Sequence, residues 1–309
     1  MKFIITVDTE ADNQWKAGEE LTLKNISALP RFQALCEKYN FIPTYLITHE
    51  VADDPLAVTM LSTWQKNNKA EIGTHLHPWT NPPLVAYEQG KHLYPSSLTD
   101  EDFKNKLTVL TEKIGKNFGK RPTSYRAGRW GLGPSHAQIL RDLGYVADCS
   151  VTPKVSWAGS DKLGGGIGPD FRGESVFPYI FSNGLLEMPM TILYTGVLWS
   201  EKNTLAKKFS FFPENLIKKI LNKLFFQKKW LRIFPESTTS DWVEVYNSAK
   251  KNNLPVLEFM IHSSELAPGC SPYAKTPEAV EKIYNNLEAL FSFLAKQGVE
   301  GIALNTFRL

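Results

Sequence analysis

Short apolar runs alternate with amphipathic stretches along the whole chain, and this alternation limits the possible folds more than any other feature. The predicted strands are 3–7, 42–47, 70–73, 123–126, 145–148, 185–190, 256–262 and 301–304. The predicted helices are 26–39, 100–118, 134–143, 240–252 and 277–297. Such alternation is typical of a parallel sheet with crossover helices. Over 309 residues it favours one closed or nearly closed α/β barrel over two separate domains.

The composition is that of an ordinary globular protein, with 42% hydrophobic and 22% charged residues. The net charge of +3 is too small to indicate a nucleic-acid partner. Three cysteines, at positions 36, 149 and 270, do not make a disulfide framework. No signal peptide precedes the first predicted strand, and no apolar run approaches the ~20 residues of a transmembrane helix. We therefore expect a cytoplasmic protein, with peripheral membrane contact as an additional hypothesis.

Ionisable side chains stand at or just beyond the carboxyl ends of five predicted strands. They are Asp8 and Glu10, His75 and His77, Arg126, Asp148, and His262. Each has an ordinary interpretation by itself, because acids cap helices and loop histidines are commonly solvated. The carboxyl ends of parallel strands, however, meet at one rim, where functional groups gather in α/β folds. Together these residues predict an active site.

The residue types form a chemically coherent set. Two imidazoles and one carboxylate can bind zinc or another divalent ion and leave a position open for water. A separate carboxylate can act as a general base, and a nearby arginine keeps that carboxylate ionised. A further histidine, held by an aspartate, can protonate a leaving group. The set predicts metal-assisted hydrolysis of a carbonyl compound.

Five motifs, VDTE, EIGTHLHP, YRAGRWG, GYVADCS and MIHSSE, resemble those of the NodB-like polysaccharide deacetylases (carbohydrate esterase family 4). The resemblance covers essentially the whole chain. It implies a distorted (β/α) barrel of about seven strands, with residues 1–309 as one domain. It also implies removal of N- or O-linked acetyl groups from a sugar or polysaccharide precursor with a divalent metal, zinc by preference, with cobalt or nickel as alternatives.

The resemblance assigns catalytic roles residue by residue. Asp8 matches the base, and Arg126 matches the arginine that pairs with it. His262 matches the general acid, and Asp148 is expected to orient His262. The backbone N–H groups of residues 128–130 are expected to stabilise the oxyanion.

The resemblance also assigns the metal ligands, with one departure from the family pattern. Glu10 is the expected carboxylate ligand and His75 the first histidine ligand. The second histidine normally follows four residues later, where this chain has Trp79, so His77 is the nearby substitute. This H-x-H spacing suits a strand end or an extended turn, because alternate residues of a strand share a side. The alternative carboxylates, should Glu10 not bind metal, are Asp8 and Asp12.

Three tryptophans of the expected rim loops have two interpretations. They are Trp79, Trp130 and Trp157. They could stack on sugar rings, or they could be ordinary packing residues.

A basic, aromatic insertion at about 202–235 interrupts the barrel pattern. Residues 202–232 contain nine Lys or Arg and one Glu, a net charge of +8 that leaves −5 for the remainder. Several apolar residues between 216 and 224 recur at helical spacing. A basic amphipathic helix of this kind can lie on an anionic membrane surface. The other interpretations are a packed helix with a solvated basic face, a dimer contact, or an anionic polysaccharide site.

Several functions remain open at the level of sequence. The leading hypothesis is a deacetylase that acts on an acetylated sugar or a lipid-linked saccharide. The same barrel could hydrolyse a non-sugar amide, or a relative with a broken metal site could bind carbohydrate without catalysis. A glycoside hydrolase is disfavoured, because it would need Asp8 and Glu10 opposed across a glycosidic bond.

Overall fold

The structure is a computed structural model that describes residues 1–14, 21–84, 93–159, 168–196, 208–209, 211–212 and 215–309. The strands are β1 Lys2–Thr9, β2 Pro43–Ile47, β3 Glu71–Leu76, β4 Ser124–Ala127, β5 Ala147–Asp148, β6 Tyr179–Ile180, β7 Leu186–Glu187, β8 Ile192–Tyr194, β9 Lys228–Trp230, β10 Val256–His262 and β11 Glu300–Gly301. The helices are α1 Leu29–Lys38, α2 Pro55–Lys66, α3 Asp100–Phe118, α4 His136–Asp142, α6 Leu216–Leu221, α7 Thr239–Lys251 and α8 Pro277–Lys296.

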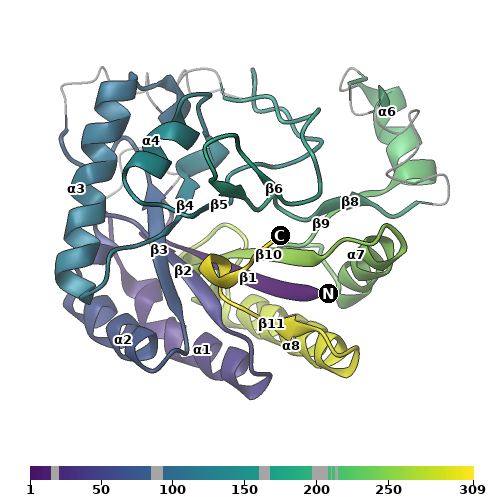
Figure 1. Ribbon diagram of the computed structural model, residues 1–309. Coiled ribbons are helices and arrows are strands. Elements are labelled where there is room, and N and C mark those ends of the chain that lie inside the picture. The colour runs from purple at the N-terminus through teal and green to yellow at the C-terminus, as the bar shows by residue number, and fades with distance from the viewer. Residues whose placement is uncertain (15–20, 85–92, 160–167, 197–207, 210, 213–214) are drawn as a thin grey trace.

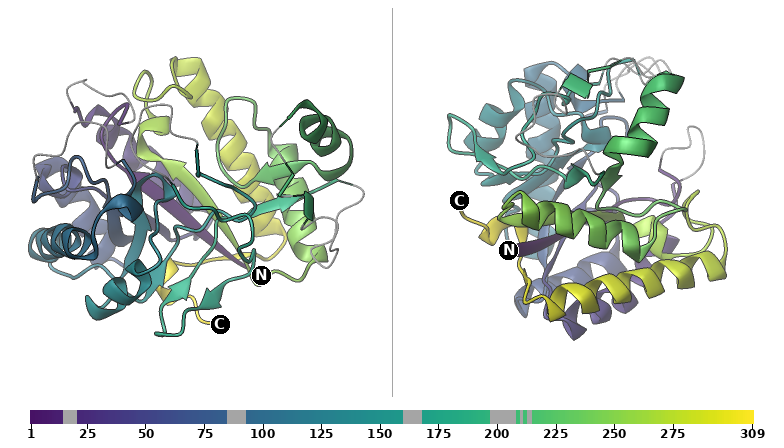
Figure 2. Two further views of the ribbon diagram at one scale, coloured as in Figure 1. Left: turned by 90° about the horizontal axis from the view of Figure 1, so that it is seen from above. Right: turned by 90° about the vertical axis from the view of Figure 1, so that its right-hand side faces the viewer.

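One curled sheet runs through the molecule in the order β10-β1-β2-β3-β4-β5-β7-β6, and β11 pairs with the start of β1. The strands from β10 to β7 in this order are all parallel to their neighbours, and β6 is antiparallel. Helices lie around the outside of the curl (Figures 1 and 2). The predicted α/β class, a distorted (β/α) barrel of about seven strands, is confirmed.

The barrel is distorted where β7 and β10 would otherwise meet. There Leu231 lies between Thr191 and Met260 of β10. Leu231 N bonds to Thr191 O at 2.9 Å, and Met260 N bonds to Leu231 O at 3.2 Å. The rest of the curl keeps a regular register, which brings distant residues together. Asp8 lies opposite His262, and His75 lies opposite Arg126. The carboxyl ends of four strands thus meet at one rim.

Two element boundaries differ from the prediction at the first helix and the third strand. The helix predicted over 26–39 begins as a short 3₁₀ turn, and α1 starts at Leu29, because Pro30 suits only the first turn of an α-helix. The strand predicted over 70–73 continues to Leu76, so His75 lies within β3 and His77 directly after it. The second difference decides the geometry of the site.

Three predicted strands are much shorter than expected, and 185–190 forms a strand only over Leu186–Glu187. In the other two, 145–148 and 301–304, side chains and helix ends occupy backbone groups. Tyr145 N bonds to Leu140 O at the end of α4, so β5 starts only at Ala147. At the end of the chain, Leu304 N bonds to the hydroxyl of Thr44, and residues 304–306 form a 3₁₀ turn instead of a strand. The two strands, β5 and β11, still overlap the predicted ranges 145–148 and 301–304.

The predicted basic insertion leaves the sheet as a separate hairpin. β8 and β9 pair antiparallel as a two-stranded sheet, and α6 lies between them in the chain. Figure 1 shows α6 at the upper right, apart from the helices around the barrel. Residues 202–207, 210, 213 and 214 of the insertion fall outside the described part of the chain. Within the described ranges, no helix combines the length and apolarity needed to cross a bilayer.

Candidate active site

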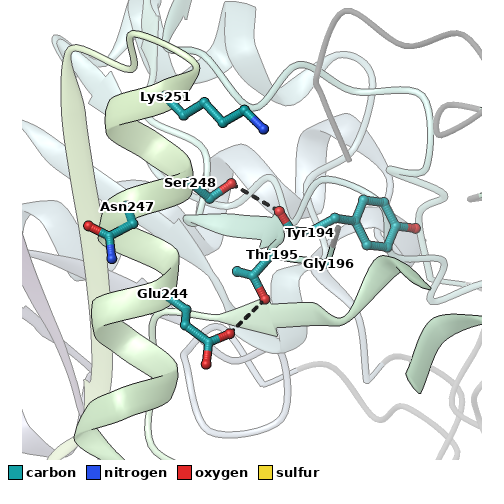
Figure 3. Close-up of a pocket in the computed structure, with 7 residues that line it drawn as sticks. All are labelled: Tyr194, Thr195, Gly196, Glu244, Asn247, Ser248 and Lys251. Atoms are coloured by element: carbon teal, nitrogen blue, oxygen red, sulfur yellow. Dashed lines mark hydrogen bonds between the residues drawn. The ribbon is translucent and has the colours of Figure 1, made fainter. Parts of the chain in front are cut away.

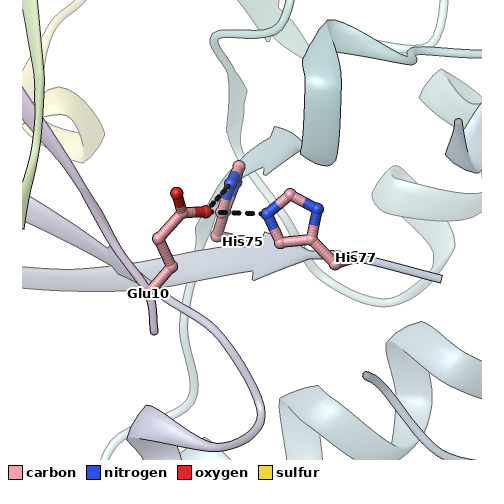
Figure 4. A group of neighbouring side chains, drawn as sticks. All are labelled: Glu10, His75 and His77. Atoms are coloured by element: carbon pink, nitrogen blue, oxygen red, sulfur yellow. Dashed lines mark hydrogen bonds and ion pairs between the residues drawn. The ribbon is translucent and has the colours of Figure 1, made fainter. Parts of the chain in front are cut away.

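Glu10, His75 and His77 converge at the rim on one carboxylate oxygen (Figure 4). Glu10 Oε2 lies 2.8 Å from His77 Nε2 and 3.4 Å from His75 Nε2. One donor atom from each residue lies within 4.8 Å of the other two, and all three side chains are buried. With Asp8, Arg126 and His262, described below, these residues form what we call the rim cluster.

The end of β3 explains how an H-x-H spacing places both rings on one side. His75 and His77 are two residues apart on an extended backbone, and their ring centroids are 4.6 Å apart. The chain then turns sharply, and the buried side chain of Lys106 fixes the turn. Its Nζ donates to Pro78 O at 3.0 Å and to Asn81 O at 2.8 Å. The end of β3 thus brings the two histidine rings together at a spacing of two residues. The usual spacing of four residues would need a loop of a different path.

The hydrogen bonds of His75 indicate that its Nε2 can bind a cation. His75 Nδ1 lies 3.1 Å from the carbonyl oxygen of Arg126, so Nδ1 carries the proton and donates. In the neutral ring Nε2 then holds a lone pair that faces Glu10 Oε2. Second contacts of this kind commonly fix the tautomer of metal-binding histidines. The donor set therefore fits a divalent ion such as zinc.

His77 is held by close packing. The backbone at Gly128 approaches the ring so nearly that a Cβ there would lie 2.5 Å from His77 Nδ1. In the described part of the chain, this buried nitrogen has no hydrogen-bond partner. The ring of Trp79 lies 4.4 Å from that of His77, centroid to centroid. Burial lowers the pKa of His77, so the ring is neutral and able to act as a ligand.

Asp8 is paired with a completely buried arginine. Arg126 donates from Nη1 to Asp8 Oδ1 at 2.7 Å and from Nη2 to Glu258 Oε1 at 2.6 Å. Burial opposes ionisation of Asp8, but Arg126, His75 and His262 outweigh it and lower the pKa of the carboxyl. Asp8 is therefore an ionised carboxylate, as a general base must be.

Sequence reasoning missed Glu258. It lies within β10, where an acid interrupts an apolar strand, and it shares a side with His262 through the strand period of two. That lone acid was the available signal. Besides Arg126, Glu258 accepts a hydrogen bond from Thr6 on β1. Burial raises the pKa of Glu258, although Arg126 opposes that shift.

His262 lies beside Glu10 and is held by a glutamate that the sequence analysis did not consider. His262 Nε2 is 3.8 Å from Glu10 Oε1, and His262 Nδ1 is 3.1 Å from Glu265 Oε1. Burial opposes protonation of the ring, but Glu265 outweighs burial and raises the pKa of His262. The motif MIHSSE contains this partner three residues after the histidine, one 3₁₀ turn away.

The prediction that Asp148 orients His262 is wrong, since the contacts of Asp148 lie elsewhere. Asp148 Oδ1 accepts from Ser150 Oγ at 2.6 Å, and the side chain lies beside that of Glu187. Burial raises the pKa of both carboxyls. Asp148 raises the pKa of Glu187 further, whereas the hydrogen bond with Glu187 acts in the opposite direction on Asp148. Ser150 Oγ in turn accepts from Ala127 N at the end of β4. The pair supports the strand that carries Arg126 and does not contact the histidine.

Asp12, the alternative carboxylate ligand, organises a loop. Its Oδ1 accepts from Asn25 Nδ2 at 2.6 Å, and its Oδ2 accepts from Thr22 Oγ1 at 2.6 Å. Burial opposes ionisation, but these hydrogen bonds outweigh it and lower the pKa of Asp12. Among the described residues, the three-residue donor group does not include Asp12.

Two of the three tryptophans are engaged within the protein. Trp130 is buried against Arg126, with the guanidinium carbon 4.8 Å from the ring centroid. Trp157 donates from Nε1 to Thr152 Oγ1 at 2.9 Å. Trp79 is half-buried beside His77. Of the three tryptophans, Trp79 lies beside a member of the Glu10, His75 and His77 group and is partly exposed.

A shallow pocket of about 200 Å³ lies between α7 and the β8–β9 hairpin (Figure 3). Glu244 accepts from Thr195 Oγ1 at 3.2 Å, and Ser248 Oγ donates to Tyr194 O at 2.9 Å. Two residues of α7 that line the pocket, Glu244 and Ser248, thus bond to residues of the hairpin that line its other side. The pocket contains no member of the rim cluster.

Comparison with solved structures identifies other proteins that share this fold. A 4-alpha-glucanotransferase from Thermococcus litoralis matches with a TM-score of 0.54 and 12% identity, over 98% of this chain and 39% of that one. A GH57-type branching enzyme from Pyrococcus horikoshii matches with a TM-score of 0.52 and 11% identity, over 99% and 69%. A family 4 acetyl xylan esterase from Clostridium thermocellum matches with a TM-score of 0.42 and 13% identity, over 98% and 88%. Searches of protein-family models and of curated proteins found no match.

Proposed function

We propose that this protein is a metal-dependent hydrolase that removes N- or O-linked acetyl groups from a sugar or polysaccharide precursor. The observation that carries the proposal is the convergence of Glu10, His75 and His77 beside Asp8 and its arginine. A carboxylate and two imidazoles leave a coordination position open for water, as in hydrolytic zinc sites. The resemblance to NodB-like deacetylases assigns the same residues to metal binding. Zinc is the proposed ion, with cobalt and nickel as alternatives.

The proposed roles follow from the charges at the rim. A divalent ion at Glu10, His75 and His77 would supply Lewis acidity to the acetyl carbonyl and lower the pKa of water. Asp8, kept ionised by Arg126, accepts a proton from the water that attacks the carbonyl carbon. The arginine also prevents Asp8 from turning away, because it is fixed on its other side by Glu258.

The leaving group requires a proton, and His262 is placed to give it. Glu265 outweighs burial and raises the pKa of His262, so the ring keeps a second proton to higher pH than an ordinary histidine does. With Nδ1 held by Glu265, Nε2 faces the side of the cluster where Glu10 lies. Proton transfer from Nε2 accompanies cleavage of the C–N or C–O bond, and the products are acetate and a free amine or alcohol.

The charges also argue against a glycoside hydrolase that uses Asp8 and Glu10. Such an enzyme needs one protonated carboxylic acid with a raised pKa to protonate the glycosidic oxygen. The pKa values of Asp8 and Glu10 are both lowered, by Arg126 and by the two histidines respectively. Neither acid would hold a proton at neutral pH.

The proposal is tested by metal content and acetate release in the same preparations. We would measure both for the wild type, His77→Ala and His49→Ala, purified without chelator. His49 is a histidine outside the rim cluster and serves as the matched control. The substrates would be an N-acetylglucosamine oligomer, an acetylated xylo-oligosaccharide and a non-sugar acetamide.

We expect about one equivalent of divalent metal in the wild type and in His49→Ala, and its loss in His77→Ala, from a site that has three protein ligands. Acetate release should be lost with the metal. A wild type without metal, even after reloading with zinc, cobalt or nickel, would overturn the proposal. Release from the acetamide alone would move the assignment to a non-sugar amide hydrolase.

A further inference from the structure

Between β8 and β9 the chain forms a projecting segment, which we call the arm. It comprises the described residues from Lys208 to Phe226 and contains α6. Figures 1 and 2 show α6 projecting from the β8–β9 hairpin, apart from the helices that cover the barrel. The rim cluster and its proposed chemistry make no use of this segment.

In an ordinary amphipathic helix the apolar side faces the protein, whereas on the arm apolar side chains face outward. Leu216 and Ile217 are 72% and 66% exposed, whereas Lys218 is only 7% exposed. The ammonium of Lys218 turns inward and donates to Phe212 O at 2.9 Å. The interpretation of this segment as a packed helix does not account for the exposure of Leu216 and Ile217. The helix presents hydrocarbon to its surroundings.

The exposed apolar side chains are concentrated on this one segment. Of the 13 large hydrophobic residues that are exposed in the described ranges, six lie between positions 211 and 225. They are Phe211, Phe212, Leu216, Ile217, Ile220 and Phe225. Single exposed hydrophobic residues are normal, but six of them on one short segment indicate a surface that contacts something else.

A small aromatic cluster fixes the arm in this orientation. The rings of Phe209 and Phe226 stack with centroids 4.0 Å apart, and Tyr194 of β8 contacts both at about 6 Å. Asn215 caps α6 by accepting from Lys218 N at 2.9 Å. The inner face of the arm is thus already occupied. The exposed side chains cannot turn inward without displacing these rings.

The same segment also carries exposed lysines. Lys208, Lys219 and Lys223 are exposed, and the described part of the arm contains no acidic residue. Over 202–232 the sequence has nine basic residues and one acid. Apolar side chains at the centre with lysines beside them are the pattern of a segment that lies in an anionic membrane interface. The lysine stems can lie along the hydrocarbon while their ammonium groups reach lipid phosphates.

We propose that the arm docks the protein on the surface of an anionic lipid bilayer. Leu216, Ile217 and the neighbouring apolar side chains enter the interface, and the lysines contact the headgroups. A hydrated polysaccharide would offer no hydrocarbon to these two side chains. A second copy of the chain would bring a segment of the same strong positive charge against this one, which opposes a symmetric contact.

The test is co-flotation of the full-length protein with lipid vesicles. We expect binding to vesicles that contain phosphatidylglycerol and at least ~10-fold weaker binding to pure phosphatidylcholine, with affinity falling as salt rises. Leu216→Ser with Ile217→Ser should weaken binding at least ~10-fold. Lys219→Ser with Lys223→Ser should weaken it ~25-fold, since each lysine contributes about a factor of five.

The control changes one leucine and one isoleucine that are exposed elsewhere on the protein. Leu56 and Ile180 are 48% and 50% exposed, and Leu56→Ser with Ile180→Ser should bind vesicles like the wild type. Asp8→Asn should also bind normally, because docking does not depend on the chemistry at the rim. Circular dichroism and thermal melting would verify that each variant is folded.

Three results would overturn the proposal. The first is unchanged flotation of the Leu216→Ser, Ile217→Ser variant, and the second is equal binding to neutral and anionic vesicles. The third is absence of vesicle binding, which can be accompanied by a concentration-dependent dimer, seen by sedimentation, that the same variant dissociates. Such a dimer would assign the face to a second copy of this chain.

Discussion

The rim cluster and the arm both depart from the usual distribution of residues, in which charged groups are exposed and apolar groups are buried. The rim buries ionised groups, and the arm exposes hydrocarbon. At the rim the cost of burial is offset inside the protein, because Arg126 lies between Asp8 and Glu258 and two histidines face Glu10. On the arm the described structure provides nothing that covers Leu216 or Ile217. The burial of a side chain therefore does not by itself indicate its role, because the groups that contact it must also be known.

The strongest test of this comparison removes the buried partner at the rim. Arg126→Met should lower the free energy of unfolding by about 3–5 kcal/mol, because it leaves two buried carboxylates without a counter-ion. Urea denaturation at pH 7 would measure the loss. The deficit should shrink at low pH, since protonation of Asp8 and Glu258 removes the uncompensated charge.

Arg129 provides the matched control three positions along the chain. It is only partly buried, and its guanidinium lies over the ring of Tyr94 at 4.9 Å. Arg129→Met should cost less than about 1 kcal/mol, the usual size of an exposed cation–π contact. Equal losses in the two variants would show that charge pairing at the rim contributes nothing particular to stability.

A buried histidine at which burial outweighs the nearby carboxylate, Asp100, sharpens the comparison. His136 stacks on Phe103 with centroids 3.6 Å apart, and its Nδ1 accepts from Gly133 N at 3.0 Å. Burial lowers the pKa of His136 to about 4. At His75 burial acts in the same direction, but Asp8 and Glu10 outweigh it and raise the pKa. The balance between burial and the neighbouring carboxylates sets the direction of the pKa shift, since burial still prevails at His77, which among the described residues has Glu10 alone within hydrogen-bond distance.

The pH dependence of stability follows from that lowered pKa. The unfolded chain binds a proton at His136 near pH 6.5, whereas the folded chain resists it until about pH 4. The neutral ring therefore contributes stability above pH 6.5, and about 3 kcal/mol is lost as the pH falls to 4. His136→Phe keeps the ring but cannot titrate. Its unfolding free energy should fall less steeply over this range, and parallel curves would contradict the assignment.

Glu265 tests the same idea through activity. Glu265→Gln keeps the shape of the side chain but removes its charge from His262 Nδ1, so the pKa of His262 should fall. We expect acetate release to drop about 10–100-fold, the usual effect of losing such a supporting contact. The alkaline limb of the pH–rate profile should move to lower pH, because His262 loses its second proton sooner. Metal content should stay at the wild-type value, and an unmoved alkaline limb would assign Glu265 a purely structural role.

The sequence predicted the fold and the components of the rim because both depend on local periodicity. Strand ends can be located from apolar runs, and parallel topology brings those ends together. Asp8, His75, Arg126 and His262 could therefore be placed at one rim without coordinates. The expected ligand group Glu10, His75 and His77 does converge in the structure.

The partners of these residues could not be predicted in the same way. Glu258 meets Arg126 across 132 positions of sequence, and nothing local connects them. The carboxylate for His262 was sought on another strand, at Asp148, although Glu265 lies one short turn away. The orientation of the arm depends on the stacking of Phe209 on Phe226, which helical periodicity does not report. Sequence patterns identify faces, but tertiary contacts decide which face is covered.

The smallest expected effect concerns the arm and completes the comparison. Leu216→Ala should change the free energy of unfolding by less than about 0.5 kcal/mol, because the side chain is as solvated in the folded protein as a surface residue can be. The same substitution at Leu140, which is fully buried on α4, should cost about 2–5 kcal/mol. Chemical denaturation of both variants would measure the difference. A substantial loss at Leu216 would mean that this side chain packs within the protein in solution, so that the arm would have no free hydrocarbon to offer a membrane.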